Sequence, residues 1–150
     1  MITVGVELGP KIAAIGKMFS PEERRGLMYV VATDMRDNID TQFESQGAHF
    51  LGRRWQHLSE RRLAERKAKD PAGPWPILQD TGNLRRSWET VATSERATVG
   101  TAGVSYASPH EFGQDRLPQR KILPYDALAR EIAVTSAEVY VELMVGKLPK

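Results

Sequence analysis

The chain opens with a strict alternation of apolar and polar positions. Apolar side chains occupy every second position from Ile2 to Leu8, with Thr, Gly and Glu between them. This period of two is typical of a half-buried β-strand. Apolar residues at helical spacing then predict a short helix over residues 11–19.

The strongest helix signal begins at Ser20. Ser20 is suited to cap the first amides, Pro21 takes the first helical position, and Glu23 is placed to bond back to the cap. An apolar stripe follows at every third or fourth position: Met28, Val31, Met35, Ile39 and Phe43. Gly47 is suited to end the helix in a left-handed conformation, so we predict one long helix between Ser20 and Gly47.

A second, highly charged helix is predicted over residues 59–69, with Leu58 and Leu63 on its small aliphatic face. Three prolines and one glycine in residues 70–76 cannot continue a regular element. We expect an exposed loop there, carrying Trp75.

Residues 88–93 and 96–101 are rich in Val, Thr and Trp and predict a β-hairpin. Its central pair, Ser94 and Glu95, lacks the Gly or Asn of the tightest turns, so a longer turn stays open. A last helix is predicted over residues 125–146, followed by a frayed tail at 147–150. Its predicted apolar stripe is Leu128, Ile132, Val139, Leu143 and Met144.

The order strand, helices, strands, helix predicts the α+β class: an antiparallel β-sheet with long α-helices packed on one face. With 150 residues, 41% of them apolar, we expect a single domain over residues 1–150. The absence of cysteine excludes disulfides and thiolate chemistry. No apolar run approaches the roughly 20 residues of a membrane-spanning helix, and the start does not resemble a signal peptide, so we expect a protein assembled in the cytosol.

Charge is distributed unevenly, although the net charge is only +2. Residues 21–46 carry three Arg against six Asp and Glu, a net −3, and residues 53–69 carry seven Lys and Arg against two Glu, a net +5. The candidate interface or DNA contacts are Arg53, Arg54, Arg61, Arg62, Arg66, Lys67, Lys69 and Trp75. Glu60 and Glu65 interrupt the basic run, which favours a solvated helix face or an acidic neighbour over DNA.

Side chains suited to catalysis do not form a recognisable motif. His110-Glu111 resembles the start of a zinc-protease helix, but Gln114 stands where the second His is needed. We expect His110 to be bonded to nearby backbone in a tight turn beside Tyr106. The other possible metal or nucleophile residues are His49, His57, Ser87, Ser105 and Ser108. None has the required neighbours, so we predict no catalytic residue, metal or cofactor.

Four short elements follow one another along the chain. The first is Trp55, Leu58 and Ser59. The second is Leu78, Thr81, Gly82, Leu84 and Ser87. The third is Gly100, Thr101, Tyr106, Ala107, His110 and Gly113. The fourth is Pro118 and Arg120, leading into the last helix. In this order the four elements resemble the phage virion morphogenesis family, which comprises tail-completion and neck proteins of Mu-like and P2-like phages.

Structural roles can be assigned to these residues from their chemistry. Gly82 and Gly113 are placed for positive φ angles, and Thr81 for capping the turn at Asn83. Leu84 and Trp55 are candidate core anchors, and Arg120 is suited to a fixed bond to a carboxylate or to turn carbonyls. Pro109 is expected to bend or end any helical turn around it, and Gln119 stands where a small residue is common in the family.

The resemblance implies a non-enzymatic virion protein at the head-to-tail neck or tail end, which joins the tail tube to the head connector. It implies a homo-oligomeric ring of six or twelve subunits, with other neck, connector and tail tube proteins as partners and no membrane. Two alternatives remain: a connector or accessory protein that contacts packaged DNA through residues 53–69, and a hydrolase using His110.

Overall fold

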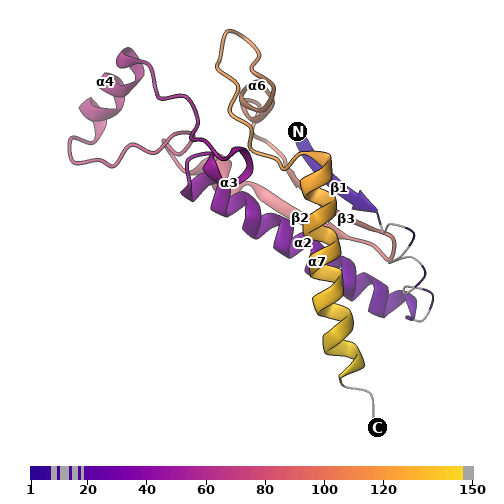
Figure 1. Cartoon of the computed structure of the whole chain (residues 1–150). Coiled ribbons are helices and arrows are strands. Elements are labelled where there is room, and N and C mark those ends of the chain that lie inside the picture. Colours follow the sequence, from indigo (N-terminus) through magenta and orange to yellow (C-terminus); the bar gives the residue numbers. More distant parts are fainter. Residues whose placement is uncertain (8–9, 11–13, 15–16, 18, 147–150) are drawn as a thin grey trace. The chain divides into compact units, whose positions relative to one another are not determined.

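The computed structural model describes residues 1–7, 10, 14, 17 and 19–146 (Figure 1). The strands are β1 (Ile2–Glu7), β2 (Trp88–Ala92) and β3 (Arg96–Thr101). The helices are α2 (Pro21–Glu44), α3 (Ala48–Leu51), α4 (Glu60–Lys69), α5 (Asn83–Arg86), α6 (Ala107–Phe112) and α7 (Asp126–Val145). The predicted helix at residues 11–19 and the predicted tail at 147–150 lie outside the described residues, apart from positions 14, 17 and 19.

The three strands form one antiparallel sheet in the order β1-β3-β2, which confirms the α+β class. The predicted hairpin is β2-β3, and its turn is held by Thr93. The Thr93 amide donates to the Arg96 carbonyl (2.9 Å), and its Oγ1 accepts from the amides of Arg96 (3.0 Å) and Glu95 (3.2 Å). This hydroxyl stabilises a turn that lacks Gly and Asn.

Helix α2 begins and ends as its sequence predicts. The amide of Ser20 donates to the Glu23 carboxylate (2.7 Å), and the Glu23 amide donates to Ser20 Oγ (3.2 Å), which is the reciprocal capping box. The predicted stripe residues Met28, Val31, Met35, Ile39 and Phe43 are all buried. Beyond the helix, Gly47 has a φ of 98°, and a Cβ there would lie 2.5 Å from the Trp55 ring. Glycine is therefore required at this position for both its conformation and its size.

Helix α7 has the predicted extent but buries a different face. Val139 and Leu143 are 51% and 61% exposed, whereas Ala129, Ala133, Ser136 and Ala137 are buried. The predicted stripe was therefore wrong for Val139 and Leu143. Small residues are buried because α7 approaches α2 closely. The Tyr140 hydroxyl donates to the Glu23 carbonyl (3.3 Å), and a Cβ on Gly26 would lie 2.9 Å from the same hydroxyl.

Two compact units are distinguished along the chain. The first consists of Met1–Ile2, Asn38–Trp88 and Thr101–Leu123; the second consists of Thr3–Asp37, Glu89–Gly100 and Pro124–Lys150. Each unit combines stretches that are far apart in sequence, and the single domain over residues 1–150 stays a prediction. The signature elements lie in the first unit, apart from Gly100.

The buried face of α7 can be tested by exchanging residue sizes. We expect Ala137→Leu to lower the free energy of unfolding by about 1–3 kcal/mol, because a larger side chain has no room in a packed contact. Leu143→Ser should change it by less than about 0.5 kcal/mol. Urea unfolding at one protein concentration measures both, and a larger loss for Leu143→Ser would contradict the assignment.

Candidate functional site

Residues 120–123, here called the strap, cross the first unit as an irregular segment without helix or strand structure. Two of its main-chain amides, those of Ile122 and Leu123, donate to Glu111, which lies on α6 and is only 1% exposed. One carboxylate oxygen of Glu111 accepts from the amides of Ile122 (2.6 Å) and Leu123 (3.1 Å), and the other accepts from Lys121 Nζ (2.9 Å). A buried carboxylate is tolerated when it is bonded in this way.

The Lys121 carbonyl of the strap is bonded by two further side chains. Gln42 Nε2, at the end of α2, donates to it (2.8 Å), and Trp55 Nε1 also donates to it (3.0 Å). Gln42 is fully buried and its Oε1 accepts from the Phe50 amide (2.9 Å). Trp55 is 3% exposed and meets Phe43 edge-on at 5.7 Å, so the predicted apolar anchor is confirmed.

Arg120 makes the predicted bonds to turn carbonyls. Its Nε and one terminal nitrogen donate to the Gln56 carbonyl at 3.3 and 3.2 Å. The other terminal nitrogen lies 3.4 Å from His110 Nδ1. Burial lowers the pKa of Arg120. Its guanidinium therefore joins the first and third signature elements to the strap.

His110 lies beside Tyr106, as expected, with the two rings edge-on at 6.4 Å. Its side-chain partner is the guanidinium of Arg120 rather than backbone, and it lies on helix α6 rather than in a tight turn. Because arginine only donates, Nδ1 is the acceptor in this contact, which requires the neutral form of the ring. Burial first, and then the charge of Arg120, lower the pKa of His110.

The two glycines and two flanking residues of the signature act as predicted, and one proline does not. Gly82 and Gly113 have φ angles of 73° and 67°, and the Asn83 amide donates to Thr81 Oγ1 at 3.4 Å. Leu84 is fully buried. Pro109 was expected to bend or end a helical turn, but it lies in the first turn of α6. Backbone N–H groups in a first turn have no acceptor within the helix, so proline costs no hydrogen bond there.

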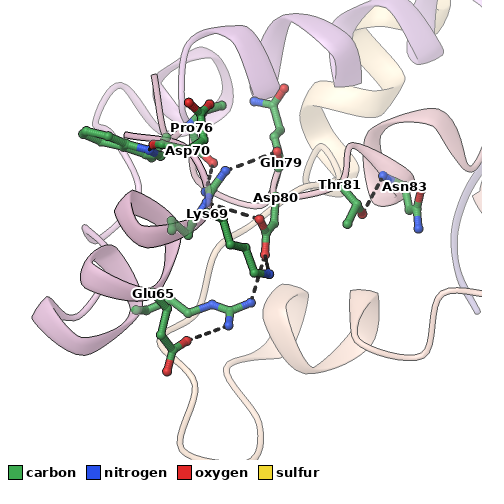
Figure 2. A network of polar contacts seen from close by, with 11 residues as sticks. Glu65, Lys69, Asp70, Pro76, Gln79, Asp80, Thr81 and Asn83 are labelled. Atoms are coloured by element: carbon green, nitrogen blue, oxygen red, sulfur yellow. Dashed lines mark hydrogen bonds and ion pairs between the residues drawn. The ribbon is translucent and has the colours of Figure 1, made fainter. Parts of the chain in front are cut away.

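A polar network attaches α4 to the segment that follows it (Figure 2). Arg66 is buried and donates to the carbonyls of Pro76 (2.6 Å) and Gln79 (3.3 Å). Asp80 accepts from Arg62 (3.2 Å) and lies 3.5 Å from Arg66 Nε. Arg66, predicted as a surface contact, therefore has a structural role.

Trp75 does not project freely from its loop. Its indole N–H donates to the Asp70 carbonyl (2.7 Å), and Lys67 Nζ lies 5.2 Å from the ring centroid, within cation–π range. Both contacts hold the indole against the end of α4. The expectation of an exposed loop holds for residues 70–72 and 74, but Trp75 itself is half-buried.

The signature elements meet around one cleft of about 1230 Å³ in the first unit, here called the arginine cleft. The signature residues that line it are Trp55, Leu58, Ser59, Leu78, Thr81, Tyr106, His110, Pro118 and Arg120. From the basic segment, Arg54, Arg62 and Arg66 also line it, whereas Arg53, Arg61 and Lys67 are exposed elsewhere. Residues distant in sequence thus build a single concave surface.

The cleft offers binding groups rather than an assembled catalytic site. Ser87, one candidate nucleophile, is bonded to the Leu84 carbonyl and to the Thr101 hydroxyl, and neither is a base that activates it. Over the described residues, no group of three or more His, Asp or Glu is placed to hold a metal ion. In the same part of the chain, no helix is both long and apolar enough to cross a membrane.

These features define an α+β protein whose signature residues build a hydrogen-bonded scaffold around a basic cleft. A model of the phage virion morphogenesis family matches residues 11–139, and the chain belongs to this family. Comparisons with curated proteins and with solved structures found no match. The family indicates a structural role in phage virion morphogenesis and a virion-associated protein.

Sequence reasoning missed the two buried side chains that hold the strap. Gln42 stands beside Phe43 and carries no motif, and Glu111 was considered only as part of an incomplete zinc motif. A polar residue adjoining the apolar stripe of a long helix was the available signal for Gln42. Its partner at Lys121 lies 79 residues away, which no local pattern indicates.

Removing the Glu111 carboxylate should strongly destabilise the first unit. We expect Glu111→Ala to cost on the order of 3 kcal/mol or more, because two buried amides of the strap lose their acceptor. Glu111→Gln should cost less, since it keeps one acceptor oxygen. Glu95→Ala, in the exposed hairpin turn, is the control. Equal unfolding midpoints for Glu111→Ala and Glu95→Ala would refute this role.

The lowered pKa of His110 predicts a loss of stability in acid. The folded protein binds a proton at His110 less readily than the unfolded chain does. Neutral His110 therefore contributes to the free energy of unfolding above the unfolded pKa of about 6.5, and this contribution is lost as pH falls below that value. We expect His110→Gln to reduce the slope of the free energy of unfolding, plotted against pH, between about pH 7.5 and 5.5. The wild-type protein, measured over the same pH range, is the reference; an unchanged slope for His110→Gln would contradict this prediction.

Proposed function

We propose that the protein is a structural component of the head-to-tail neck or tail end, where it completes the tail and joins the tail tube to the head connector. The family match over residues 11–139 carries this proposal. The geometry supports it, because the signature residues form hydrogen-bonded turns, caps and core anchors rather than a reaction centre.

The protein acts as a homo-oligomeric ring of six or twelve subunits in this proposal. A ring needs two different surfaces on one protomer that fit each other. The net charges of −3 on residues 21–46 and +5 on residues 53–69 support such a pairing. Part of this charge is used internally, since Arg85 pairs with Asp40 (3.1 Å) and Glu44 (2.8 Å).

Contact with packaged DNA is the second candidate, and the geometry supports it less well. Arg66 is buried, and Glu65 accepts from both Arg61 (3.1 Å) and Arg62 (2.9 Å). These hydrogen bonds lower the pKa of Glu65. Of the basic run, Arg53 and Arg54 are the exposed arginines for which we find no internal ion pair within the described residues.

Loss of the protein should separate heads from tails. In the phage or prophage that encodes it, we expect particles assembled without the protein to accumulate as unjoined heads and tails, counted by negative-stain microscopy. Supplying the wild-type chain should restore joined particles, and the purified chain should show rings and a matching mass at moderate salt. Normal joined particles without the protein would overturn the neck assignment, and a monomer at every concentration would overturn unaided ring assembly.

A salt titration separates the DNA alternative from this proposal. DNA contact predicts an affinity that falls steeply with salt and is lost on reversing Arg53, Arg54 and Arg61 together. No detectable binding at low salt would remove the alternative and leave the neck assignment intact.

A further inference from the structure

The arginine cleft is lined by a strong excess of positive charge together with apolar side chains. Its charged lining consists of Arg54, Arg62, Arg66, Arg116, Arg120 and Asp80, a formal net +4. Its apolar lining includes Leu58, Leu78 and Leu117, together with the ring of Tyr106. A site of this volume exceeds the roughly 300–1,000 Å³ of small-molecule pockets, which favours a polymeric ligand.

Two of the five arginines are available to a ligand. Arg66 and Arg120 are buried and bonded to carbonyls, and Arg62 is bonded to Glu65 and Asp80. Arg54 and Arg116 are exposed, and we find no side-chain hydrogen bond or ion pair for either of them within the described residues. Exposed guanidiniums beside apolar side chains are suited to carboxylates on a chain that also carries an apolar group.

The backbone of the cleft is held in an unusual conformation at two lining residues. Leu78 and Arg116 have φ angles of 61° and 64°, and neither is glycine. Non-glycine residues in the left-handed region cost free energy and persist where the surroundings impose them, often at binding sites. Both residues line the same cleft.

We propose that the arginine cleft binds an acidic polypeptide segment of another virion protein, with carboxylates on Arg54 and Arg116 and an apolar side chain against Leu58, Leu117 and Tyr106. The virion origin of the segment rests on the proposed function; the binding chemistry does not.

The acidic helix of a second copy is a poorer occupant than a separate segment. On α2, Glu23 caps the helix, Asp40 and Glu44 bind Arg85, and Asp34 and Asp37 have polar or electrostatic contacts of their own. Glu23, Asp40 and Glu44 are therefore already engaged within the protomer, which leaves fewer acidic side chains of α2 for the cleft of a second copy; the ring pairing proposed above rests on the remaining charge of residues 21–46.

Nucleic acid is also a poorer occupant. Its phosphates match the arginines, but a duplex backbone offers nothing apolar to the leucines, and Asp80 repels phosphate. Single strands need stacking platforms, and Tyr106 is the exposed aromatic ring of the lining, since Trp55 is buried.

Fluorescence anisotropy with a labelled peptide of Glu residues around a central Leu tests the site. Arg54→Glu and Arg116→Asn should each weaken binding about tenfold or more; Asn is chosen because it tolerates a positive φ. Arg61→Glu is the matched control, because Arg61 lies on α4 outside the cleft. It should bind within about twofold of wild type, since surface charges act weakly at a distance in salt.

Several results would overturn the proposal. One is that a peptide with Gln in place of Glu binds as tightly as the Glu peptide. Another is that Arg61→Glu weakens binding as much as the two cleft substitutions do. A third is that a DNA oligonucleotide binds more tightly than the peptide and that the two cleft substitutions abolish its binding. The proposed function is tested by two separate measurements: the mass of the purified protein in solution, and the count of joined heads and tails. A ring that joins particles but ignores the peptide refutes the cleft assignment alone.

Discussion

The first unit depends on satisfying the main chain of the strap at residues 120–123. This segment belongs to no helix or sheet, yet Ile122 and Leu123 are buried and their amides must find acceptors. The Glu111 carboxylate supplies them, and Lys121 balances its charge. Because each of these bonds replaces water that burial removes, losing one group leaves others unpaired.

The same strap joins three of the four signature elements: the first, the third and the fourth. Trp55 from the first element bonds to the Lys121 carbonyl, and Arg120 from the fourth reaches the carbonyl of Gln56 and the ring of His110 in the third. The second element is attached separately, through Arg66 of α4, which donates to the carbonyls of Pro76 and Gln79. The walls of the cleft are thus positioned by buried polar side chains.

Local patterns predicted those parts of the fold that local chemistry determines. The capping box at Ser20, the stripe of α2 and the hairpin follow from residues within a few positions of each other. The predicted stripe of α7 was wrong at Val139 and Leu143 because the buried face is set by the close approach to Gly26, which favours alanine over these larger residues. Gln42 and Glu111 escaped prediction because their partners on the strap are set by tertiary structure.

Charge along the sequence is therefore a poor guide to the charge that a partner meets. In residues 53–69, Arg66 is as buried as a core residue and Arg62 is held between Glu65 and Asp80, while Arg54 remains exposed. Arg116 lies outside that segment, yet it lines the same cleft. The basic surface is assembled by folding, and the buried arginines that shape it are distinct from the exposed ones.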